Sequence, residues 1–359
     1  MDEVIKTLKI RIKDKHAGVL SSMAREVNMA WNFCNETSFR SIRERQKFLS
    51  GFDLQKLTDG FSKCDGIQIG SATTQQLCEE YATRRRQFKK ARLNWRVSNP
   101  KSSRRSLGWI PFKSRAVSYK GGQLAFCGKK FNVWDSYGLA QLKFRSGSFS
   151  EDALGRWYFN VQVKVQAERS GGSATIGIDL GLKIAATCSD GAELQSGIYR
   201  KYEVALATAQ RARKKHRVKV IHAKIANTRK DAMHKFSSAL VKRSGAIFVG
   251  NVQPKSMIKT KMAKSTLDAG WSMFKTMLEY KCNDAGVVFE EVNEAYTTQT
   301  CSCCGVIPDS SPKGRAGLGI RQWICSNCGT EHHRDVNAAK NIAALGLQRL
   351  AGGIQATVQ

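Results

Sequence analysis

Four cysteines near the end of the chain have the spacing of a metal site. They form two pairs, Cys301 with Cys304 and Cys325 with Cys328, each with two residues between the sulfurs and a glycine after the second cysteine. Two intervening residues let one tight turn present both thiolates to one ion, and the glycine accepts the positive φ that such turns often need. We therefore expect one zinc ion bound by these four cysteines. Because four thiolates leave no open position, the zinc should be structural.

Three neighbouring residues could compete for this ion. Cys303 directly precedes Cys304, but adjacent cysteines chelate one ion poorly, so Cys301 is the preferred partner. His332 and His333 follow the second pair and are alternative ligands.

Two aspartates stand where catalytic acids could lie. Asp179 ends an apolar run in IGIDLG, and a carboxylate emerging from a buried strand is costly unless it is paired or holds a metal. Asp335 precedes the helical pattern VNAAKNIAALGL, where an acid could simply stabilise the helix N-terminus. Taken together in so basic a chain, the two acids suit Mg²⁺ and phosphodiester chemistry. A site with two Mg²⁺ ions would need a third carboxylate as ligand.

A run of cations with interleaved aromatic residues predicts a nucleic-acid-binding helix. Residues 84–96, RRRQFKKARLNWR, hold seven cations and no acid, with Phe88 and Trp95 between them. A solvated helix face is the simpler alternative, but this composition favours a helix that follows phosphates. The residues expected to bind nucleic acid are Arg84, Arg85, Arg86, Lys89, Lys90 and Arg92.

The bulk composition also indicates a polyanionic partner. The 359 residues include 59 Lys and Arg against 29 Asp and Glu, a net charge of +30. The basic stretches lack the long apolar face that membrane-surface binding needs, and no apolar run is long enough to span a membrane. The first residues show no secretory signal, which predicts a cytoplasmic protein, in the cytoplasm or nucleoid of a prokaryote.

The hydrophobic periodicity divides the chain into alternating kinds of structure. A strand is expected in residues 1–15, helices in 16–95, β structure in 109–167 and a linker in 168–174. The later elements are a strand around Asp179, a basic helical region over 202–243, strands at 246–252 and 286–292, and a helix over 262–284.

From Thr175 to its end the chain resembles the TnpB family, transposon-encoded relatives of type V CRISPR effectors. IPFKSR (110–115) extends the likeness weakly into the first half. The segments that carry it are GIDLGLK (177–183), HAKIANTRKDAMHKFSSALV (222–241), YTTQTCSCCG (296–305), WICSNCG (323–329) and HHRDVNAAKNI (332–342).

The resemblance implies an α+β multidomain fold: a RuvC/RNase H-like α/β nuclease domain with a four-cysteine zinc insertion, an N-terminal helical recognition lobe and a β-barrel wedge domain. The expected division is a wedge domain at 1–15 and 109–170, a helical lobe at 16–108, the RuvC-like domain at 171–297, a zinc module for target nucleic acid at 298–330 and a last RuvC-like segment at 331–359.

One departure from the family pattern concerns the catalytic acids. Members usually carry a glutamate at the end of the second RuvC strand, in a pattern like IEDL, whereas this chain has Gly250 and Asn251 there. The candidate replacement is Glu294, directly after the strand VVFEEV. The expected catalytic and magnesium-binding set is therefore Asp179, Glu294 and Asp335.

The function that the resemblance implies is an RNA-guided, Mg²⁺-dependent DNA endonuclease that uses two metal ions, with a guide RNA and a target DNA as partners. The first alternative is a nuclease-dead, RNA-guided DNA-binding protein or repressor. A strand-transfer transposase and a Holliday-junction resolvase fit less well, because the helical lobe, the zinc placement and the basic first half favour guided cleavage.

Overall fold

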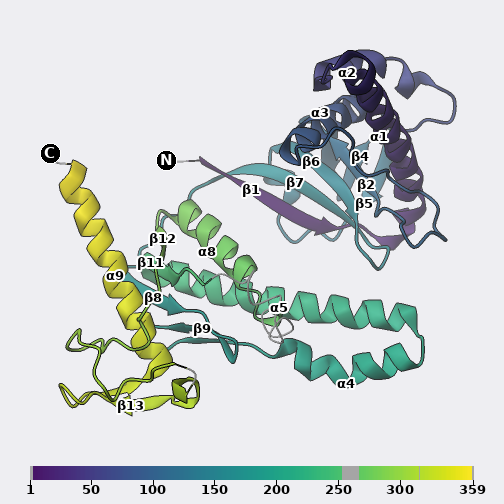
Figure 1. Cartoon of the computed structure of the whole chain (residues 1–359). Helices are drawn as coiled ribbons and strands as arrows, with labels where there is room; N and C mark the ends of the chain where they lie inside the picture. The colour runs from purple at the N-terminus through teal and green to yellow at the C-terminus, as the bar shows by residue number, and fades with distance from the viewer. Residues whose placement is uncertain (1–2, 253–266, 315, 358–359) are drawn as a thin grey trace. The chain divides into compact units, whose positions relative to one another are not determined.

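The computed structural model describes residues 3–252, 267–314 and 316–357. The chain forms two compact units, Met1–Gln166 and Ala167–Gln359 (Figure 1). The boundary lies next to the predicted linker. The finer division into five parts remains a prediction.

Three helices build the α part of the first unit. They are α1 (Ala17–Arg45), α2 (Gly51–Leu57) and α3 (Ser71–Gln87). Helix α2 begins with a capping box, in which the Ser50 hydroxyl and the Asp53 carboxylate each bind the other residue's backbone N–H. Short 3-10 turns lie at Asp14–His16, Phe61–Lys63 and Leu139–Gln141.

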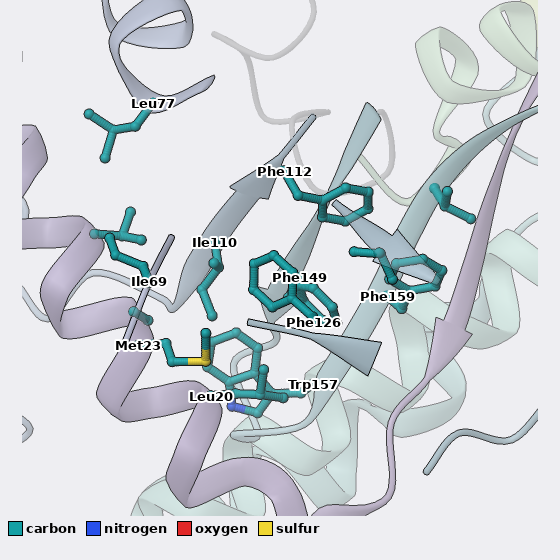
Figure 2. Packing of buried hydrophobic residues seen from close by; sticks show 14 of the residues in the cluster. Leu20, Met23, Ile69, Leu77, Ile110, Phe112, Phe126, Phe149, Trp157 and Phe159 are labelled. Carbon is teal, nitrogen blue, oxygen red and sulfur yellow. The ribbon is translucent and has the colours of Figure 1, made fainter. Parts of the chain in front are cut away.

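Two antiparallel sheets form the β part of the first unit. One has the order β1 (Glu3–Arg11), β7 (Trp157–Gln166), β6 (Phe144–Glu151), β2 (Trp109–Phe112). The other contains β3 (Val117–Lys120), β4 (Gln123–Phe126) and β5 (Lys129–Asn132). A bridge between Ile12 and Val133 connects strand ends of the two sheets. Phenylalanines from both sheets, Phe112, Phe126, Phe149 and Phe159, pack in one core (Figure 2).

The predicted helix over residues 84–96 is wrong beyond Gln87. Helix α3 ends there, and Lys89 has a positive φ of 50°. Asparagines on α1 hold the following chain in another conformation. The Asn35 side chain accepts from Leu93 N at 2.9 Å and donates to Leu93 O at 2.8 Å. Asn32 binds the backbone N–H and carbonyl of Arg96 in the same way, each at 2.9 Å.

The second unit contains a five-stranded sheet of the order β10-β9-β8-β11-β12. The strands are β8 (Ala174–Asp179), β9 (Ile184–Cys188), β10 (Glu193–Gln195), β11 (Ser244–Gly250) and β12 (Val288–Val292). Strands β8, β11 and β12 run parallel, whereas β9 and β10 are antiparallel to their neighbours. The central strands are almost wholly apolar because both faces of the sheet are covered.

Four long helices accompany this sheet: α4 (Ile198–Arg211), α5 (Lys215–Arg243), α8 (Trp271–Ala285) and α9 (Arg334–Thr357). The predicted basic helical region is thus two helices packed side by side (Figure 1). The turn between them places Arg213 at a φ of 51°. The start of the helix predicted over 262–284 lies outside the described residues. A two-stranded sheet of β13 (Gln322–Ile324) and β14 (Glu331–His333) follows a 3-10 turn at Ala316–Gly319.

Helix α9 lies unusually close to strand β8. A Cβ at Gly177 would collide with the backbone carbonyl of Ala339, so only glycine permits this approach. Ala338 and Ala339, both fully buried, keep the facing side of the helix small. The close contact carries the first turn of α9, which contains Asp335, to the end of β8.

Candidate nuclease centre and zinc module

The four predicted zinc ligands come together in the structure. The sulfurs of Cys301, Cys304, Cys325 and Cys328 all lie within 4.8 Å of one another, with 3.6 Å between Cys301 and Cys328 and 3.8 Å between Cys304 and Cys325. Zinc–sulfur bonds of about 2.3 Å in a tetrahedron require sulfurs about 3.8 Å apart. The donor set and its spacing therefore fit one zinc ion.

Backbone turns position each pair of cysteines as the spacing predicts. Gly305 and Gly329 have φ of 76° and 72°, and their N–H groups donate to the carbonyls of Cys301 and Cys325. The Thr330 hydroxyl, 3.2 Å from the Cys328 sulfur, lowers the pKa of that thiol to about 6, which favours the thiolate that a metal needs.

The alternative ligands occupy different positions. Cys303 is exposed and outside the set of four sulfurs. His332 is buried, with Nε2 3.0 Å from the Cys301 sulfur and its ring against Trp323. His332 thus contacts the cluster, and His333 pairs with Gln322 across the β13–β14 hairpin.

Three carboxylates gather at the C-terminal edge of the parallel strands. Asp179 and Gly250 end β8 and β11, and Val292, which pairs with Gly250, ends β12. Glu294 follows two residues after Val292, and Asp335 lies in the first turn of α9.

Asp179 is deeply placed among other acids. Burial, followed by the charges of Asp335 and Glu294, raises the pKa of Asp179 to about 7, against the lowering effect of Arg334 and Arg321. Partly buried carboxylates that repel one another raise the free energy of the folded protein unless a cation neutralises them. Carboxylate oxygens are the ligands that Mg²⁺ prefers.

Glu294 occupies the space that the missing side chain at position 250 leaves. A Cβ at Gly250 would collide with the Glu294 carboxylate and would lie 3.3 Å from its Cβ. Glu294 Oε2 is buried without a hydrogen-bond partner, and burial raises the pKa of this carboxyl. An orphaned carboxylate oxygen at this edge fits a metal ligand.

The competing glutamates of β12 are engaged elsewhere. Glu290 forms an ion pair with Arg349 of α9 at 3.0 Å, and Glu291 one with Lys275 of α8 at 2.6 Å. Successive side chains of a strand point to opposite faces of the sheet, and the two glutamates accordingly pair with different helices.

Two arginines bind Asp335, a feature that the sequence did not single out. Arg334 Nη2 lies 2.9 Å from Asp335 Oδ1, and Arg321, just before the zinc hairpin, pairs with Oδ2. Among the residues that the structure describes, only the four sulfurs form a group within 4.8 Å of one another. The three carboxylates are more widely spaced. Arg321 directly precedes β13 and Arg334 directly follows β14, so only the fold reveals that both bind Asp335.

The predicted nucleic-acid-binding cations separate into two kinds. Arg85 is only 7% exposed and donates to the Ser38 hydroxyl and, at 2.6 Å, to the Leu49 carbonyl. It holds α3 against α1 and does not fit the predicted role. The other five are exposed: Arg84, Arg86, Lys89, Lys90 and Arg92.

No described helix is long and apolar enough to span a bilayer.

Two segments of the chain match known protein families. Residues 158–261 match a family described as "Probable transposase", and residues 271–342 match "Cas12f1-like, TNB domain". A mimivirus protein named "TnpB-like protein L79" is 32% identical over 35% of this chain and 24% of its own length. The resemblance to the TnpB family is confirmed.

Two further matches extend over nearly the whole chain. A "Putative RNA-guided DNA endonuclease" of Streptomyces pristinaespiralis is 27% identical over 98% of this chain and 92% of its own length. A Cas12f1 chain, solved in a complex with sgRNA and target DNA, superposes with a TM-score of 0.60 at 12% identity, over 95% of this chain and 99% of that one. The likeness in fold to that Cas12f1 chain therefore includes both units.

Proposed function

We propose that this protein is an RNA-guided DNA endonuclease that hydrolyses phosphodiester bonds with Mg²⁺ held by Asp179, Glu294 and Asp335. The observation that carries the proposal is the placement of Glu294, whose Oε2 is buried without a hydrogen-bond partner in the space left by Gly250. The similarity to proteins named as RNA-guided endonucleases supplies the class of activity.

The protein's own groups would act mainly by position and charge. The three carboxylates would hold the Mg²⁺ ions, which activate water and stabilise charge on the scissile phosphate. Arg321 and Arg334 contact Asp335 in the structure and can bind the anionic substrate strand near the same acid. The zinc would hold the hairpin from which Arg321 and helix α9 extend.

The proposal is tested by cleavage of a matched DNA target in Mg²⁺, with the RNA that copurifies with the protein. We expect Glu294→Ala to lower the rate by at least about 100-fold, since it removes a metal ligand. Glu291→Ala is the matched control, because Glu291 lies on the same segment but pairs with Lys275. Cleavage by Glu294→Ala at the wild-type rate would refute the role of Glu294.

A nuclease-dead, RNA-guided binder is the second candidate. The ion pairs of Asp335 with two arginines favour it, since they compensate this acid without a metal. Guided DNA binding by the wild type without cleavage of matched DNA would establish this alternative.

A further inference from the structure

The first unit contains a cavity that the nuclease chemistry does not use. Its volume is about 420 Å³, within the range of small-molecule pockets. It lies where α1, the end of α3, the segment after α3 and strand β2 meet. No acid contributes to the lining. Aromatic and cationic side chains dominate it, namely Trp31, Arg84, Phe88, Lys90, Arg96 and Trp109.

The aromatic groups offer flat surfaces to a ligand. Trp31 and Trp109 pack edge to face, with ring centroids 6.1 Å apart. Phe88 also lines the cavity and is 59% exposed, so its ring is accessible to a ligand. The buried indole N–H of Trp31 has no hydrogen-bond partner. Unpartnered buried donors are rare in proteins.

The cations of the cavity suit an anionic ligand. The Arg96 guanidinium carbon lies 5.9 Å from the Trp31 ring centroid and 5.6 Å from that of Trp109. Arg96 Nε donates to Asn28 at 2.5 Å and Nη2 to the Leu107 carbonyl at 2.8 Å. No described carboxylate pairs with Arg96 or Lys90, and burial lowers the pKa of Arg96. A desolvated cation without a counter-ion is costly unless a ligand supplies the charge.

The asparagines of α1 fix this arrangement. Because Asn32 and Asn35 bind the backbone at Arg96 and Leu93, the segment that supplies Arg96 is held in place before any ligand arrives. Such preorganisation is typical of binding sites.

We propose that this cavity receives one unpaired nucleotide of the bound RNA, with its base against the aromatic side chains and its phosphate at Arg96 and Lys90. This inference rests on the proposed function, which supplies the RNA. Folded RNA offers unstacked bases in loops and bulges, and proteins bind these on aromatic and arginine surfaces.

The test compares two double variants of the full chain for affinity to the copurifying RNA. Phe88→Ala with Lys90→Ala removes exposed groups of the cavity. Phe52→Ala with Lys56→Ala is the matched control, because Lys56 lies over the exposed Phe52 ring at 4.7 Å on α2, outside the cavity. We expect the cavity variant to bind about 10-fold more weakly, and the control to bind within about 2-fold of the wild type.

Ultraviolet crosslinking of the wild-type complex gives a second readout. We expect a ribonucleotide joined to a peptide containing Phe88, Trp31 or Trp109. Equal affinities of both variants, with no crosslink at the cavity, would overturn the inference and leave the proposed function intact. A crosslink to the DNA target alone would also overturn it. Failure of the wild type to bind any RNA would overturn the proposed function as well.

Discussion

At the scale of single residues, the unusual feature of the candidate nuclease centre is that strand β11 ends in Gly250 and a carboxylate from the next strand lies beside it. Family members usually carry the acid at the end of the second strand, and here the carboxylate of Glu294 reaches the space beside Gly250 from the neighbouring strand. Adjacent strands lie about 4.8 Å apart, a distance that a glutamate side chain spans.

A swap of the acid between these positions tests this geometry. We expect Glu294→Ala with Gly250→Glu to restore at least about one-tenth of wild-type cleavage, because the carboxylate returns to the same edge of the sheet. Glu294→Ala with Asn251→Glu is the control at the next position, whose side chain accepts from the Glu294 backbone N–H and does not fill the space beside Gly250. Equal inactivity of both double variants in guided cleavage would contradict this geometry.

Lys281 gives a prediction on pH. Its ammonium donates to the His234 carbonyl and to the hydroxyls of Ser237 and Ser238, at 2.7 to 2.8 Å. Burial lowers the pKa of Lys281 to about 8. Since the unfolded chain has an ordinary lysine pKa of about 10.4, it binds more protons between these values, and folding stability rises with pH there.

We therefore expect the free energy of unfolding of the wild type to increase, relative to that of Lys281→Met, by about 1 kcal/mol as the pH rises from about 8 to about 10. This value is smaller than the full pKa shift would give, because the Lys281 side chain is partly solvated. Lys219→Met, at an exposed lysine of α5, is the control. Urea unfolding at several pH values measures the difference, and a constant difference would contradict the prediction.

At the scale of elements, the approach of α9 to β8 decides where Asp335 lies. We expect Gly177→Ala to lower the free energy of unfolding by about 3 kcal/mol, because the new Cβ meets the backbone of α9 and not a movable side chain. Gly352→Ala lies in the same helix with nothing within 4 Å and should be neutral or slightly stabilising. Thermal unfolding distinguishes them, and equal melting temperatures would count against the tight contact.

The sequence predicted the elements whose signals are local. The apolar runs around Asp179 and before Gly250 are strands, and the two cysteine pairs form the turns that their spacing implies. The segment after Gln87 was predicted wrongly because Asn32 and Asn35, more than 50 residues earlier, bind its backbone. The burial of Arg85 and the pairing of Arg321 with Asp335 likewise depend on contacts distant in sequence.

At the scale of the whole molecule, each unit has its own hydrophobic core. The large phenylalanine cluster belongs to the first unit, while the zinc cysteines and the carboxylates belong to the second. A disturbance of the zinc module should therefore remain within the second unit.

Removal of zinc by a chelator tests this separation. We expect amide hydrogen exchange to increase in β13, β14 and the first turn of α9 and to stay unchanged in β1 and β7. Cys325→Ser should reproduce the effect, whereas Cys303→Ser, at an exposed cysteine outside the cluster, should not. Unchanged exchange in the hairpin after zinc removal would contradict a structural role for the ion.

The segment from Cys328, the last cysteine of the cluster, to Asp335 is short. Its length limits where related sequences can gain or lose residues. After Cys328, Thr330 binds the backbone N–H of Cys325, Glu331–His333 form a strand, and α9 begins at once. An inserted residue there would rotate Asp335 away from Asp179. The stretch between the cysteine pairs exposes apolar residues such as Val306, Ile307 and Ile320 and returns to the same ion. Insertions and deletions among descendants should accordingly accumulate between the pairs and spare the seven-residue interval that follows them.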